Sequence, residues 1–116
     1  MKENQLVELS MDFAVAVVNT ADSITVPKSA YIINQFGRAG TSIGANIHEA
    51  QYAHSRADFI AKFEIALKEA NETTYWLKLM YKTNRISEET YKCLSEKCGK
   101  IRMLLIASCT TAKKNK

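Results

Sequence analysis

The chain has 116 residues, of which 47% are hydrophobic and 24% are charged, and its formal net charge is +4. This composition is ordinary for one globular domain spanning residues 1–116, and it excludes a disordered chain, which would lack the apolar surface needed to offset the entropy of ordering. No run of about 18 apolar residues is present, so we expect no membrane span and no membrane partner. One proline and four glycines are too few for the frequent turns of a β-sandwich or barrel. Because the N-terminus has no apolar signal-peptide core, we expect a cytoplasmic protein.

The first predicted helix covers residues 3–21. Leu6, Leu9 and Phe13 begin an apolar pattern at three- and four-residue spacing, which is one face of an amphipathic helix. The polar segment 22–25 then breaks the pattern and predicts a turn.

The second predicted helix covers residues 27–53 and opens at Pro27, whose fixed φ suits the first turn of a helix. Three glycines interrupt it, each costing about 1 kcal/mol relative to alanine in a helix interior. A phosphate-binding loop is one alternative, but no lysine follows the glycines at the P-loop position and no apolar β run precedes them. We therefore interpret them as sites of close helix packing or a local kink: Gly37, Gly40 and Gly44.

Two further helices are predicted over residues 56–82 and 88–112. Ser55 and Asp58 resemble a capping box at the start of the first. Ser87 is a favourable N-cap for the second, which has glutamates in its first turn. A three- and four-residue apolar pattern runs through both helices, at Phe63, Ala66, Ala70 and Leu77 and then at Leu94, Cys98, Ile101 and Leu105.

Four long amphipathic helices joined by short turns predict an all-α fold, most simply an antiparallel up-down-up-down four-helix bundle. A helical solenoid is the alternative, but no internal repeat of fixed period is present. The sequence contains more large apolar side chains than one buried face per helix requires, among them Tyr52, Tyr75 and Trp76. This excess predicts self-association, because large exposed apolar patches usually mark interfaces.

Positive charge is concentrated in the last third of the chain. Residues 1–76 contain six Lys and Arg against nine Asp and Glu, whereas residues 77–116 contain ten against three. A solvated helix face is one explanation, and a surface for an RNA or DNA backbone is the other. Tyr81 and Tyr91 are candidates to stack on bases, although the seam position of Tyr91 favours the core. The candidate nucleic-acid-binding residues are Lys78, Lys82, Arg85, Lys92, Lys97, Lys100 and Arg102.

A second polar set pairs Asn46 and Glu49 on one predicted helix with Glu69 and Glu72 on the next. In an antiparallel pair of helices these side chains can meet, so we predict an interhelical polar network that fixes the register of the bundle. A di-metal carboxylate site is the sharper alternative, but its Glu-x-x-His motifs are absent, so we expect no metal. Exposure to solvent is the third possibility.

The three cysteines do not indicate a disulfide framework or a zinc site, because their number is odd and no Cys-x-x-Cys pair is present. We interpret Cys93, Cys98 and Cys109 as free thiols. A Cys–His catalytic pair has little support, since two of these cysteines fall on or beside an apolar stripe far from the histidines. We expect no enzymatic activity and no cofactor.

The segment Ser42–Ala50, with the sequence SIGANIHEA, and the segment Ile65–Leu77, with the sequence IALKEANETTYWL, resemble two signatures of a bacterial four-helix-bundle family. These proteins are encoded in intervening sequences of large-subunit ribosomal RNA genes, are sometimes labelled ribosomal-protein-like, and are similar to the accessory variability protein of diversity-generating retroelements. The resemblance is specific from about Tyr31 to Leu79.

The resemblance implies a homo-oligomer, in particular a pentameric ring of bundles, with no known enzymatic activity and with a role in nucleic-acid binding. For the retroelement relatives it also implies contact with a reverse transcriptase and its RNA. Our leading hypothesis is an oligomeric bundle that binds structured RNA or a ribonucleoprotein through a basic surface. The alternative is a protein–protein adaptor that docks a partner such as a reverse transcriptase.

Overall fold

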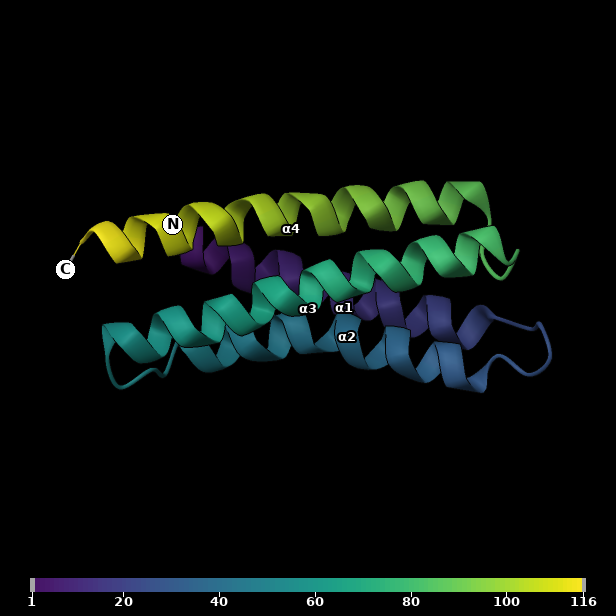
Figure 1. Ribbon diagram of the computed structural model, residues 1–116, viewed down its shortest axis with the longest axis horizontal. Helices are drawn as coiled ribbons and strands as arrows, with labels where there is room; N and C mark the ends of the chain where they lie inside the picture. Colours follow the sequence, from purple (N-terminus) through teal and green to yellow (C-terminus); the bar gives the residue numbers. More distant parts are fainter. Residues whose placement is uncertain (1, 116) are drawn as a thin grey trace.

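The computed structural model describes the backbone of residues 2–115 and the side chains from Gln5 onward. It contains four helices, α1 (Lys2–Ser23), α2 (Ala30–Ala50), α3 (Arg56–Lys82) and α4 (Glu88–Lys114), and no strand within those residues. The helices alternate in direction along a rod about 50 Å long (Figure 1). Each packs against two neighbours, in the cyclic order α1, α2, α3, α4. The all-α, four-helix prediction is therefore confirmed, and no helix in the described part of the chain is long and apolar enough to cross a membrane.

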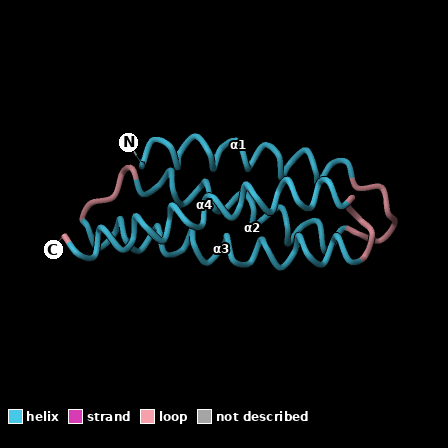
Figure 2. The backbone as a smooth tube through the Cα atoms, turned by 90° about the horizontal axis from the view of Figure 1, so that it is seen from above, coloured by secondary structure: helices cyan, strands magenta, loops and turns pink. Residues whose placement is uncertain are grey.

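The three loops that connect the helices lie at the two ends of the rod (Figure 2). The α1–α2 and α3–α4 loops share one end, which we call the two-loop end. The α2–α3 loop lies at the other end, beside the end of α4, and we call this the one-loop end. The two ends therefore carry different parts of the sequence.

Helix α2 is shorter than predicted at both ends. It begins at Ala30 rather than at Pro27, because Lys28 adopts a left-handed backbone with φ of 62°, which a continuous α-helix cannot include. Ser29 becomes the residue before the helix, and its hydroxyl donates to the carbonyl of Val26 at 2.6 Å. At the other end the helix stops at Ala50 rather than at residue 53.

Side-chain caps begin α3 and α4 where the sequence places them. The Ser55 hydroxyl accepts from the backbone N–H of Asp58 at 3.1 Å, while the Asp58 carboxylate accepts from the N–H of His54 at 3.3 Å. This reciprocal arrangement is a variant of the capping box. The Ser87 hydroxyl accepts from the N–H of Thr90 at 3.1 Å. Both predicted caps are confirmed.

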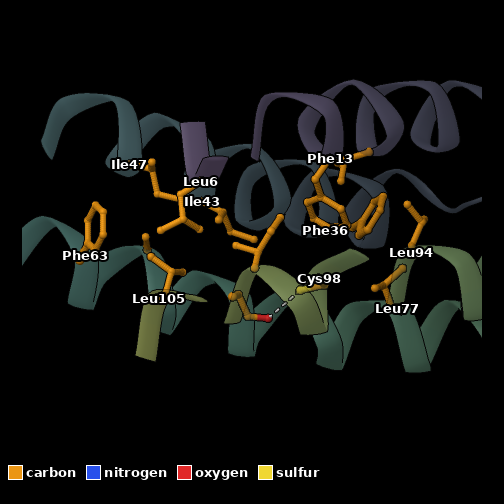
Figure 3. Close-up of a cluster of buried hydrophobic side chains, with 14 of the residues drawn as sticks. Leu6, Phe13, Phe36, Ile43, Ile47, Phe63, Leu77, Leu94, Cys98 and Leu105 are labelled. Atoms are coloured by element: carbon orange, nitrogen blue, oxygen red, sulfur yellow. Dashed lines mark hydrogen bonds between the residues drawn. The ribbon is translucent and has the colours of Figure 1, made fainter. Parts of the chain in front are cut away.

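The core is a continuous column of apolar side chains contributed by all four helices (Figure 3). Phe13, Phe36 and Phe63 are among its largest fully buried members. Burying one such side chain contributes about 1.5–3 kcal/mol, so the column is the main source of the stability of the bundle. Thr73, a buried polar residue in this column, donates its hydroxyl to the Glu69 carbonyl at 2.7 Å.

Glycine allows α1 and α2 to approach closely. A Cβ added at Gly40 would lie 2.7 and 2.9 Å from the two Cγ atoms of Val17, and one at Gly44 would lie 3.2 Å from the Ser10 carbonyl oxygen. Gly37 has open space beside it. Close packing is therefore confirmed for two of the three glycines.

Candidate nucleic-acid interface

The seven basic residues proposed from the sequence divide between two sides of α4. Arg102 turns toward α3, where its Nε donates to Asn71 Oδ1 at 2.7 Å. Lys97 and Lys100 lie on the other side, in a groove that also contains Leu9 and Phe13 of α1. The structure therefore does not bring all seven side chains together.

The larger group follows the boundary between α3 and α4. Lys78 lies seven residues, or two helical turns, beyond Asn71, and Lys82 lies one turn beyond Lys78. Both lysines are therefore on the same face of α3 as Asn71, the residue that Arg102 contacts. Lys82 and Lys92 directly follow Tyr81 and Tyr91, whose rings stack between the helices at 4.6 Å. We call the following residues the α3–α4 basic face: Lys78, Lys82, Lys92 and Arg102.

Positive charge on the α3–α4 basic face is largely available to a ligand. Lys78, Lys82 and Lys92 are exposed, and Arg102 is half-buried. Among the side chains of residues 5–115 the one ion pair made by these four residues joins Lys92 Nζ to Glu88 Oε2 at 3.5 Å, with both side chains more than half exposed. Such a pair is weak in water and is readily exchanged for a phosphate contact.

The groove around Lys97 and Lys100 has a mixed charge. Asp12 and Glu96 line it together with these two lysines. The carboxylates reduce the local positive potential, and a polyanion approaching the groove would meet them as well. This side of α4 is therefore a poorer candidate for nucleic acid than the α3–α4 basic face.

Arg85 has a structural contact at the two-loop end. Its Nε donates to Ser29 Oγ at 2.8 Å, which ties the α3–α4 loop to the α1–α2 loop. The loop itself is closed by backbone hydrogen bonds from Asn84 to Tyr81 and from Arg85 to Met80, with Asn84 in the left-handed region at φ of 59°. This is the pattern of a Schellman motif, which asparagine tolerates well.

Tyr75 is the exposed aromatic residue of this surface, rather than the two tyrosines considered from the sequence. Tyr81 and Tyr91 are half-buried and stack on each other, with an interplanar angle of 7°, so their facing sides are not free for bases. Tyr75 is 60% exposed and lies three residues before Lys78 on α3. Its spacing of three from Lys78 is the sequence signal that could have identified it.

The polar cluster between α2 and α3 centres on Arg38, which the sequence analysis did not include. Arg38 Nη1 lies 3.3 Å from Glu69 Oε1, and Arg38 Nη2 contacts Glu72 Oε2. Glu72 Oε2 also accepts from Trp76 Nε1 at 3.0 Å. The hydrogen bond from Trp76 and that from Arg38 lower the pKa of Glu72, because both stabilise its ionised form.

Asn46 and Glu49 do not join this cluster. Asn46 donates to the carbonyl of Ser42 in its own helix at 2.9 Å, and Glu49 is exposed. The predicted network is therefore wrong for Asn46 and Glu49. Glu69 and Glu72 do contact α2, but their partner there is Arg38. Among the residues described, no group of three His, Cys, Asp or Glu side chains is arranged to hold a metal ion.

The cysteines are free thiols in different surroundings. Cys98 is fully buried, and its Sγ donates to the Ala70 carbonyl at 3.5 Å (Figure 3). Burial raises the pKa of Cys98 to about 11, and it also raises the pKa of Cys109. Cys93 is exposed. The two buried thiols are therefore protonated and unreactive at neutral pH.

Comparisons with known proteins agree with the four-helix fold. A family model described as "23S rRNA-intervening sequence protein" matches residues 2–107. A crystal structure of a protein with unknown function from the S23 ribosomal protein family of Bacteroides thetaiotaomicron VPI-5482 is 46% identical in sequence, with a TM-score of 0.88, and the alignment covers 95% of this chain and 99% of that chain. A search of curated proteins gave no match.

Proposed function

The chain belongs to the 23S rRNA-intervening sequence protein family, and from this we propose that it is a non-enzymatic, oligomeric helical bundle that binds structured RNA through the α3–α4 basic face. One observation carries the proposal. Lys78 and Lys82 lie on the same face of α3 as Asn71, which Arg102 of α4 contacts, so the three basic side chains follow the boundary between these two helices. In this proposal the protein acts in the cytoplasm, where bacterial ribosomal RNA resides.

Recognition in this proposal is directed to the backbone and shape of the RNA. Lysine side chains neutralise phosphates without distinguishing bases, and the described residues contain no motif that reads base edges. Tyr75 adds an exposed ring on which an unpaired base can stack. A structured RNA with a single-stranded loop or bulge is therefore the best match for this surface.

Self-association forms the second part of the proposal. Met11, Val15 and Val18 follow each other at spacings of four and three on α1 and are exposed by 62, 52 and 48%. Met11 also lines a mostly apolar groove of about 320 Å³ between α1 and α2, together with Ala14 and Gly44. Apolar surface of this kind is stabilised by burial against another chain, and a pentameric ring would repeat each basic face five times.

Binding of a structured RNA hairpin, measured by fluorescence anisotropy at two salt concentrations, tests the RNA part of the proposal. We expect affinity to fall steeply as salt rises, because each phosphate contact releases counterions. Absence of binding at low salt would contradict RNA recognition.

A protein adaptor is the second candidate function, with a reverse transcriptase as one partner to test. Met103 and Ile106 are 72 and 45% exposed on α4, away from the core, and they offer an apolar contact to another protein. Docking through such a surface depends little on salt, which separates it from RNA binding.

A further inference from the structure

A small patch on the α3–α4 boundary combines a hydrogen-bonded arginine with an exposed aromatic ring. Arg102 of α4 contacts Asn71 of α3, its Nε donating to Asn71 Oδ1 at 2.7 Å. Tyr75 lies one turn after Asn71 on α3, and Gly99 lies nearly one turn before Arg102 on α4. Because the two helices are antiparallel, both steps lead toward the two-loop end (Figure 1). We call these four residues the Tyr75–Arg102 patch.

The Arg102 guanidinium is held in place without being neutralised. Its bond to Asn71 uses Nε, and within residues 5–115 neither Nη group has a hydrogen-bond or ion-pair partner. Arg38, by contrast, contacts the carboxylates of Glu69 and Glu72. The remaining donors of a planar guanidinium match a pair of acceptors, such as the N7 and O6 atoms of guanine.

Tyr75 supplies a ring for stacking in the same patch. The residue is 60% exposed, and its ring makes an edge-to-face contact with Trp76, with the centroids 5.0 Å apart. Trp76 is itself held by a hydrogen bond from its Nε1 to Glu72 Oε2 at 3.0 Å. A ring that is exposed and braced suits stacking, because little side-chain entropy is lost when a base binds.

Gly99 leaves room for a flat ligand beside Arg102. A Cβ added at Gly99 would enter open space, so packing within the bundle does not require glycine at this position. Glycine in a helix interior costs about 1 kcal/mol relative to alanine. The missing side chain allows a planar ring to approach the backbone of α4 next to the guanidinium.

We propose that the Tyr75–Arg102 patch binds an unpaired guanine base of an RNA, with Arg102 donating to N7 and O6 and Tyr75 stacking on the ring. A phosphate group would also accept from Arg102, but it would use neither the ring of Tyr75 nor the space beside Gly99. Adenine carries an amino donor in place of O6, and this donor would face the donors of Arg102. The inference rests on RNA binding through the α3–α4 basic face and adds one base-specific contact to it.

Two RNA hairpins that differ at one ring atom test the proposal by fluorescence anisotropy. One has a single guanosine in a loop of uridines, and the other has 7-deazaguanosine there, in which a C–H group replaces the acceptor N7. We expect the guanosine hairpin to bind at least about fivefold more tightly. Equal affinities would overturn the guanine site and leave backbone recognition standing. Binding of neither hairpin at low salt would overturn both proposals.

Arg102→Lys keeps the positive charge and removes the planar fork. This variant should still bind both hairpins but should lose the preference for guanosine. Lys78→Gln is the control, because loss of a phosphate contact should weaken both hairpins by the same factor and leave the preference unchanged. A preference that persists in Arg102→Lys would overturn the assignment of Arg102 to the base.

Glutamine at two open glycines tests the space that the base needs. Gly99→Gln should abolish the preference for guanosine, because the new side chain would occupy the position of the ring. Gly37→Gln on α2 makes the same change where a Cβ also meets open space, and it should keep the preference. An unchanged preference in Gly99→Gln would overturn the placement of the base beside Arg102.

Discussion

Arg38 shows how a single residue decides which carboxylates form a cluster. Glu69 and Glu72 could be identified from the sequence as candidates for an interhelical contact, since they lie three apart on one helix. Their partner could not, because the axial offset between α2 and α3 decides whether Arg38 or Asn46 stands opposite them. Side-chain pairing across helices therefore needed the structure.

Replacing Glu72 with glutamine should reduce the acid sensitivity of the fold. The pKa of Glu72 is lowered from 4.5 by the hydrogen bonds from Trp76 and Arg38. Its contribution is therefore present above pH 4.5 and is lost as pH falls through the lowered folded-state pKa. Melting temperatures measured between about pH 5 and pH 2 should fall less in Glu72→Gln than in the wild type.

Glu49→Gln is the matched control, since Glu49 is exposed and its carboxylate makes no hydrogen bond within the described residues. It should retain the wild-type loss of melting temperature in acid. An identical acid response in Glu72→Gln and the wild type would show that the cluster does not contribute to pH-dependent stability.

Thiol reactivity should distinguish the three cysteines. In the native protein DTNB should modify Cys93 rapidly, whereas Cys98 and Cys109 should react after denaturation, because burial raises the pKa of both. Absorbance at the end of the fast phase should correspond to one thiol per chain. Rapid reaction of all three in the folded protein would contradict the buried placement of Cys98 and Cys109.

At the scale of elements, local signals predicted where helices begin better than where they pack. Ser55 and Ser87 mark the starts of α3 and α4 because an N-cap acts within its own turn. Pro27 was misleading, since the left-handed Lys28 separates it from α2. Proline permits a first helical turn but does not require one.

Two glycines on α2 should respond in opposite ways to alanine. Gly37→Ala should raise the free energy of unfolding by about 1 kcal/mol, because the position is open and alanine favours the helix. Gly40→Ala should lower it by about 1–3 kcal/mol, because the new Cβ would meet Val17. Urea denaturation of the two variants provides the comparison, and equal effects would contradict the close approach of α1 to Gly40.

At the scale of the whole molecule, the architecture was predictable because each helix carries one continuous apolar stripe and the turns are short. Which basic side chains share one surface was harder to predict from the sequence. Lys97 and Arg102 are close in sequence, yet they flank opposite sides of α4, toward α1 and α3. The neighbours on each side of a helix follow from the assembly of the bundle, not from that helix alone.

The oligomer can be tested through the exposed apolar residues of α1. Native mass spectrometry of the wild type should give five times the chain mass of 13.0 kDa. Val15→Glu should dissociate the assembly, because the charge would be buried at the interface. Met103→Glu, a comparable change at an exposed position of α4, should not. A wild-type monomer, or an assembly unaffected by Val15→Glu, would contradict this interface.

The most direct test of RNA binding through the α3–α4 basic face compares two double charge reversals of equal size. Anisotropy of a labelled RNA hairpin should show at least about tenfold weaker binding and a shallower salt dependence for Lys78→Glu/Lys82→Glu. Lys97→Glu/Lys100→Glu, in the groove that already contains Asp12 and Glu96, should have a clearly smaller effect. Equal losses in the two variants, or no loss in the first, would contradict recognition through this face.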